Sequence, residues 1–134
     1  MDNIFEVAND VLLSDLQKIS PALLIIFTRV VLYCSEHNLP LKITSIISDR
    51  EHIKNQTAVH KTGRGLDISL KGFGDLHKVR LPYLLNKWYS DIAAISKSDG
   101  VKRAAIVHDV GYGEHLHIQV KPNANWHLFN NLKE

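Results

Sequence analysis

The sequence predicts a single α+β domain in which about three helices pack against a small, mostly antiparallel sheet. The chain has 134 residues, of which 45% are hydrophobic and 22% are charged, and this suits one globular core. Apolar residues recur at helical spacing in three stretches, and short β-rich segments lie between and after them. The sequence has no repeat, linker or low-complexity tract that would divide it into separate domains.

Three helices are expected along the chain. The first covers residues 4–16, where apolar side chains recur at roughly helical spacing. The second spans 21–37, because Ser20 followed by Pro21 is typical of a helix start, and its apolar character predicts a buried scaffold. The third is amphipathic and spans 76–97.

Four strands should build the sheet. Residues 41–48 are β-rich and partly alternate, and residues 66–70 form a second short run. The polar stretch between these two segments predicts an irregular excursion. Residues 104–107 and 116–120 predict two further strands joined by a glycine-rich turn, so the sheet should be mostly antiparallel.

Composition excludes several classes of protein. Sixteen basic and 14 acidic side chains give a net charge of +2, which is too small to indicate nucleic-acid binding. The single cysteine, Cys34, excludes an internal disulfide framework and a multi-cysteine zinc ribbon. No stretch reaches the ~20 apolar residues of a membrane span, so we expect no membrane insertion. The N-terminus shows no secretory signal, which predicts a cytoplasmic location.

Two short stretches concentrate side chains that a purely structural domain has little reason to hold together. They read His60-Lys-Thr-Gly63-Arg-Gly65-Leu-Asp67 and Glu114-His115-Leu-His117. On one helix His60 and Asp67 would lie roughly 10 Å apart, too far to share an ion about 2 Å from each ligand. The two glycines accept positive φ, so the chain can turn back and bring the strand that carries Asp67 to His60. The second stretch would supply a third ligand.

The residue types favour zinc. Two imidazoles and one carboxylate are a known catalytic ligand set that leaves a fourth position for water. A base must stand beside that water, and Glu114 is the candidate. In an extended strand, however, His115 and His117 share one face whereas Glu114 faces the other. Spacing therefore leaves the third ligand open, and Glu114 can reach the same centre as His117 only if it still belongs to the preceding turn.

In the order and spacing of these motifs, the chain resembles the zinc D-Ala-D-Ala carboxypeptidase family. That family includes D-Ala-D-Ala dipeptidases and the L-alanyl-D-glutamate endopeptidases of phage endolysins, and its fold is the Hedgehog/DD-peptidase fold. The resemblance implies Zn²⁺ held by His60, Asp67 and His117, with Glu114 as the catalytic base. It also implies that Arg50, which follows a predicted strand, contacts the substrate or the developing oxyanion.

The match covers roughly residues 43–120 and departs from the family pattern in places. Ala58, Gly65 and Leu116 stand where the family favours serine, alanine and tryptophan. His115 leaves an alternative open, because the related lysostaphin-type peptidases use a His-x-His pair whose first histidine is catalytic. His115 is therefore a second candidate base.

The other five histidines, His37, His52, His77, His108 and His127, lie in no comparable pattern, and surface or helix-end positions are expected for them. His108 is followed by Asp109, a carboxylate that could orient an imidazole next to a metal site.

The resemblance implies one zinc-peptidase-like domain over residues 1–134, with a helical N-terminal part (1–40), a metal-site core (41–121) and a C-terminal tail (122–134). Its substrate would be a peptidoglycan stem peptide, cleaved by an L-Ala-D-Glu endopeptidase or a D-Ala-D-Ala carboxypeptidase, and we expect a monomer. Without a visible export signal, a phage lysis protein, released to the cell wall during lysis or carried in a virion, fits best. A cytosolic D-Ala-D-Ala dipeptidase and a non-enzymatic metal-binding module of the same fold are the alternatives.

Overall fold

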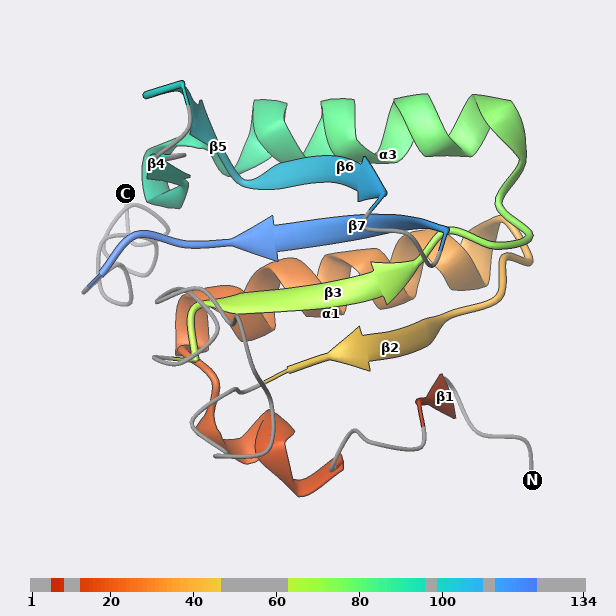
Figure 1. Ribbon diagram of the computed structural model, residues 1–134, viewed down its shortest axis with the longest axis horizontal. Helices are drawn as coiled ribbons and strands as arrows, with labels where there is room; N and C mark the ends of the chain where they lie inside the picture. Colours follow the sequence, from red (N-terminus) through yellow and green to blue (C-terminus); the bar gives the residue numbers. More distant parts are fainter. Residues whose placement is uncertain (1–5, 9–12, 47–62, 96–98, 110–112, 123–134) are drawn as a thin grey trace.

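The computed structural model describes residues 6–8, 13–46, 63–95, 99–109 and 113–122. These ranges form an α+β structure in which two α-helices pack with a mostly antiparallel five-stranded sheet (Figure 1). The helical elements are η1 (Leu13–Lys18), α1 (Pro21–Glu36), α3 (Gly74–Trp88) and η2 (Ser90–Ile92), of which η1 and η2 are short 3-10 helices. The strands are β1 (Glu6–Val7), β2 (Lys42–Ser45), β3 (Gly65–Ser69), β4 (Ala94–Ile95), β5 (Lys102–Arg103), β6 (Ala105–Asp109) and β7 (Glu114–Gln119).

The main sheet has the strand order β1-β2-β3-β7-β6 (Figure 1). The pairs β2–β3, β3–β7 and β7–β6 are antiparallel, and only β1 runs parallel to its neighbour β2. Strands β4 and β5 form a separate antiparallel pair. Strands β3 and β7, which are about fifty residues apart in sequence, therefore lie side by side in the middle of the sheet.

The central strands have one apolar face and one polar face. Because side chains alternate along a strand, Leu66 and Ile68 of β3 point to the same side as Leu116 and Ile118 of β7, and all four are fully buried. We call this side the apolar face. Helix α1 packs against β7 and α3 against β6, and buried residues of both helices join the strand residues in one hydrophobic core (Figure 1). The opposite side, the polar face, carries Asp67, His108, His115, His117 and Gln119.

The predicted second helix and the predicted strands are confirmed. Helix α1 begins at Pro21 and ends at Glu36, close to the predicted bounds. The chain leaves the helix through Asn38, whose φ of 53° lies in the left-handed region that asparagine tolerates. Strands β2, β3, β6 and β7 fall on the four predicted strand segments, with ends shifted by one to three residues.

The predicted α-helix over residues 4–16 is wrong for the parts of this stretch that the structure describes, 6–8 and 13–16. Glu6–Val7 is instead an edge strand, because Glu6 N–H donates to the Leu41 carbonyl at 2.8 Å and Ala8 N–H donates to the Ile43 carbonyl at 2.9 Å. The following Leu13–Lys18 segment is a 3-10 helix. Pairing with β2 thus satisfies backbone groups that a helix would have satisfied internally.

The third helix is shorter than the predicted 76–97. It spans Gly74–Trp88 and gives way at Tyr89 to η2 and then to β4. Ala94 pairs with Arg103 in β4–β5, so backbone hydrogen bonds to a distant segment replace a continued helix. Within the described ranges, no helix is long and apolar enough to cross a membrane.

Candidate metal centre

Asp67 and His117 meet on the polar face because β3 and β7 are paired in the register that sets these residues opposite each other. Their side chains share one side of the sheet, where directly opposed residues are close neighbours. Asp67 Oδ1 lies 2.7 Å from His117 Nδ1. His117 is buried, with 8% of its surface exposed, so the imidazole and the carboxylate interact with little competition from water.

His108 approaches the same carboxylate from β6. Its register partner on β7 is His115, and its Nε2 atom lies 3.8 Å from Asp67 Oδ1. The rings of His108 and His117 have centroids 5.6 Å apart. One donor atom from each of Asp67, His108 and His117 lies within 4.8 Å of the other two. Three non-adjacent positions of the chain therefore converge on one point of the polar face.

This donor set is compatible with a divalent metal ion. Tetrahedral zinc holds nitrogen and oxygen ligands at about 2.0–2.1 Å, so neighbouring ligand atoms lie roughly 3.3 Å from one another. The distances of 2.7 Å and 3.8 Å from Asp67 Oδ1 to the two imidazole nitrogens lie on either side of that value. All three donor atoms therefore lie in the range of separations that ligands around one ion have. Neutral imidazole and carboxylate suit several divalent metals, and the set does not by itself select zinc.

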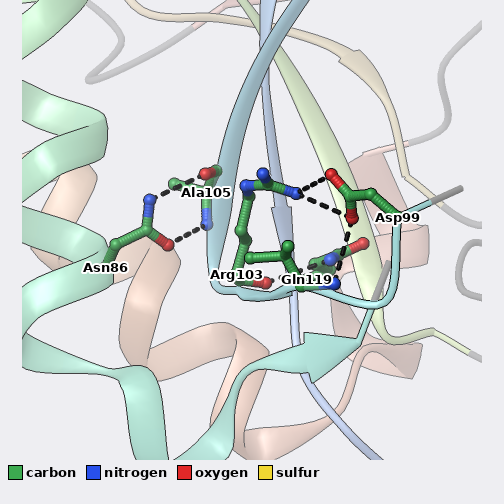
Figure 2. Close-up of polar contacts among 6 residues, drawn as sticks. Asn86, Asp99, Arg103, Ala105 and Gln119 are labelled. Atoms are coloured by element: carbon green, nitrogen blue, oxygen red, sulfur yellow. Dashed lines mark hydrogen bonds and ion pairs between the residues drawn. The ribbon is translucent and has the colours of Figure 1, made fainter. Parts of the chain in front are cut away.

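Gln119 holds the other side of the His117 ring. Its Oε1 atom lies 2.9 Å from His117 Nε2, and its Nε2 donates to the Arg103 carbonyl at 3.0 Å. Gln119 is itself buried, with 5% of its surface exposed. Figure 2 shows this amide between β7 and the segment that carries Arg103. Both nitrogens of the His117 imidazole therefore have a defined neighbour.

The segment that accepts from Gln119 is itself anchored (Figure 2). Arg103 Nη1 donates to both carboxylate oxygens of Asp99, at 3.1 Å to Oδ1 and 2.8 Å to Oδ2. A hydrogen bond from the Val101 backbone and the Arg103 guanidinium together lower the pKa of Asp99. Asn86 of α3 accepts from the backbone N–H groups of Ala104 and Ala105 and donates to the Ala105 carbonyl.

Glu114, the base implied by the resemblance, lies apart from the cluster. It is the first residue of β7, opposite Asp109, and it has the same parity as Leu116. Its carboxylate accepts a hydrogen bond from Lys78 Nζ of α3 at 3.0 Å, and this bond raises the pKa of Lys78. The structure therefore does not bring Glu114 together with Asp67 and His117. The turn conformation that would have allowed this is replaced by strand pairing.

His115, the second candidate base, does share the polar face. It pairs with His108 in the β6–β7 register, and the two rings meet edge to face with centroids 6.4 Å apart. Its Nδ1 atom is buried and has no hydrogen-bond partner among the residues that the structure describes.

The site agrees in part with the sequence-based expectation. Asp67 and His117 come together as predicted, whereas His60 and Arg50 lie outside the described residues, so their predicted roles stay predictions. The sequence predicts a surface position for His108, or a pairing with Asp109, and the structure instead places it in the cluster. The position of His108 follows from the pairing of β6 with β7. Residue spacing within a single motif carries no information about that pairing.

Comparison of the chain with models of known families, with curated proteins and with solved structures found no significant match.

Proposed function

We propose that the chain is a zinc-dependent peptidase with a Hedgehog/DD-peptidase type of fold, which hydrolyses peptide bonds in peptidoglycan stem peptides. The observation that carries the proposal is the convergence of Asp67, His108 and His117 on the polar face of an antiparallel sheet. The motif resemblance supports the peptidase class, because two of its three implied ligands, Asp67 and His117, are the pair in closest contact.

Asp67 and His117 would hold the ion, and the third ligand is either His60, from the resemblance, or His108, from the geometry. A zinc ion bound there would act as a Lewis acid on the scissile carbonyl and would lower the pKa of a coordinated water. Asp67 contributes a negative charge that offsets part of the charge of the cation.

His115 is the residue to which we assign proton transfer. It shares the face of the ligands, whereas Glu114 has the opposite parity in β7 and an ion pair with Lys78. A neutral imidazole can accept a proton from the nucleophile and return it to the leaving amine. In this scheme Arg50 would bind a carboxylate of the substrate, as the resemblance implies.

The proposal is tested by digesting purified bacterial sacculi with the full chain, with and without a chelator, and measuring the fragment masses. New D-glutamate N-termini identify an L-Ala-D-Glu endopeptidase, and released D-alanine identifies a D-Ala-D-Ala carboxypeptidase. Asp67→Ala is expected to abolish either product. Activity that survives both the chelator and this substitution would contradict the metallopeptidase proposal.

The third ligand is assigned by comparing His60→Ala with His108→Ala in a zinc titration. Loss of a direct ligand should weaken zinc binding more than the 10–100-fold typical of an outer partner. The variant with the larger loss identifies the ligand. His37→Ala, which changes a histidine on the other side of the core, is the matched control.

The base is assigned by comparing His115→Gln with Glu114→Gln. We expect His115→Gln to keep bound zinc and to lower kcat by about 10²–10⁴-fold, the usual contribution of a general base. Glu114→Gln should keep most of the activity. The reverse order would return Glu114 to the role that the resemblance implies.

One observation favours a second candidate, a non-enzymatic metal-binding module of the same fold. The carboxylate of Glu114 is engaged by Lys78 rather than directed to the cluster. Bound zinc without hydrolysis of sacculi or of free D-Ala-D-Ala would support this module. Hydrolysis of free D-Ala-D-Ala alone would indicate the dipeptidase.

A further inference from the structure

We propose that Gln119 is a positioning residue that keeps a proton on His117 Nε2 and thereby makes Nδ1 the metal-binding atom of this histidine. The inference rests on the proposed function for the presence of the metal, and it adds the residue that decides how the ligand is presented. Gln119 belongs to neither of the two motifs that carry the resemblance.

The orientation of the Gln119 amide follows from its partner on the Arg103 side. A backbone carbonyl can only accept, so the amide nitrogen of Gln119 must face the Arg103 oxygen, 3.0 Å away. The Oε1 atom is then the one that lies 2.9 Å from His117 Nε2. Because this oxygen can only accept, His117 Nε2 must carry the hydrogen.

The consequence appears on the opposite side of the ring. With the hydrogen on Nε2, the neutral imidazole has its lone pair on Nδ1, which faces Asp67 Oδ1 at 2.7 Å. Two lone pairs at this distance repel unless a cation lies between them. A divalent ion bound to both atoms would remove this repulsion.

The Gln119 amide donates to the Arg103 carbonyl, and the residues on either side of this carbonyl are held by hydrogen bonds. The carbonyl of Arg103 lies directly before Ala104, whose N–H donates to Asn86 Oδ1 at 2.7 Å, and the Arg103 side chain is paired with Asp99. Figure 2 shows the ion pair of Arg103 with Asp99 and the hydrogen bonds of Asn86 with the adjoining Ala105. The acceptor position that Gln119 offers to His117 is thus defined by α3 and by the segment from Asp99 to Arg103.

Burial explains why a glutamine at this position needs a partner on each side. Burying an amide in an apolar environment without hydrogen bonds costs a few kcal/mol. Gln119 is only 5% exposed, so a residue that merely filled this space would be apolar. Gln119 has both of its polar ends satisfied, one by His117 and one by Arg103. This arrangement matches the outer partners that orient metal-binding histidines.

The test compares Gln119→Leu with Gln119→Glu. Both substitutions remove the donor to the Arg103 carbonyl, but only glutamate keeps an acceptor for His117 Nε2–H. We expect Gln119→Leu to weaken zinc binding by about 10–100-fold and Gln119→Glu to bind at least as tightly as the parent chain. Equal affinity in the leucine variant and the parent would overturn the role of Gln119. Thermal unfolding of both metal-free variants checks that they fold.

A spectroscopic readout separates positioning from a general effect on stability. In protein labelled with ¹⁵N and loaded with ¹¹³Cd, we expect coupling from the metal to Nδ1 of His117 and a slowly exchanging hydrogen on Nε2. Coupling to Nε2 would overturn the inference and leave the proposed metal site standing. A parent chain that binds neither zinc nor cadmium would overturn both. The measurement on the parent chain decides the case even if the leucine variant does not fold.

Discussion

The apolar and polar faces of the sheet are made by alternate residues of the same strands, yet the side chains of the two faces have different roles. On the apolar face, Leu66, Ile68, Leu116 and Ile118 have no exposed surface and pack into the core beneath the helices. On the polar face, Asp67 and His117, which lie between them, and His108 of β6 supply the donor atoms of the candidate metal centre.

The comparison shows that the core sets the geometry of the site. A slip of one residue between β3 and β7 would turn every apolar side chain away from the core, so burial fixes the register strongly. The same register sets Asp67 opposite His117. Burial of the apolar face supplies the free energy that keeps the strands paired. The polar face can therefore hold acceptor atoms close together although they repel each other.

Substitutions of two neighbouring residues of β7 should show the difference between the two faces most clearly. Leu116→Ala removes a fully buried side chain and should lower the free energy of unfolding by about 2–5 kcal/mol. His115→Ala, one residue earlier on the polar face, should cost much less. Urea denaturation of the metal-free variants measures both, and equal losses would show that the faces do not differ in this way.

The thiol of Cys34, on the apolar side of the molecule, gives a chemical test of burial. Burial raises the pKa of Cys34 to about 11, from 9.0 for a free thiol. Since only the thiolate reacts, its population at pH 8 and hence its reaction rate should be roughly 100-fold below that of the unfolded chain. The rate should rise about tenfold per pH unit up to pH 10. Labelling with a disulfide reagent across this range checks the prediction, which a pH-independent rate would contradict.

Asn86 joins α3 to the edge of the sheet, and its loss should have a smaller effect than loss of a core leucine. Asn86→Ala leaves the N–H groups of Ala104 and Ala105 and the Ala105 carbonyl without this side-chain partner. We expect a loss of about 1–3 kcal/mol in the free energy of unfolding. Denaturation with urea provides the measurement. A weaker zinc affinity in the same variant would show that Asn86 on α3 also helps to position Gln119.

The pair formed by Lys78 and Glu114 should matter least. Both side chains are partly exposed, at 30% and 46%, so solvent screens their attraction. Lys78→Gln should therefore leave the thermal midpoint unchanged, at low and at high salt alike. A clear shift of the midpoint would show that Glu114 is anchored more firmly than its exposure suggests.

Much of the fold could be predicted from the sequence, because local patterns determine it. Ser20 and Pro21 marked the start of α1, and partial alternation marked β2. The two-residue strand Glu6–Val7 could not be predicted in this way. Its conformation depends on hydrogen bonds to β2 rather than on its own residues.

The site shows the same division between local and long-range information. Asp67 and His117 belong to motifs with characteristic spacing, whereas His108 becomes a neighbour only through the pairing of β6 with β7. Glu114 is held in β7 by its pairing with Asp109 of β6 and by a hydrogen bond from Leu70 N–H to the Glu114 carbonyl at 3.0 Å. Sequence left the turn and strand alternatives open, and they place its carboxylate on different sides.

The central claim is that Asp67 and His117 hold one divalent ion on the polar face, and a zinc titration of the metal-free chain tests it directly. We predict one zinc ion per chain for the parent and for His37→Ala, and loss of this binding in Asp67→Ala and His117→Ala. A parent chain that binds no zinc, or variants at Asp67 and His117 that bind it as tightly as the parent, would contradict the account.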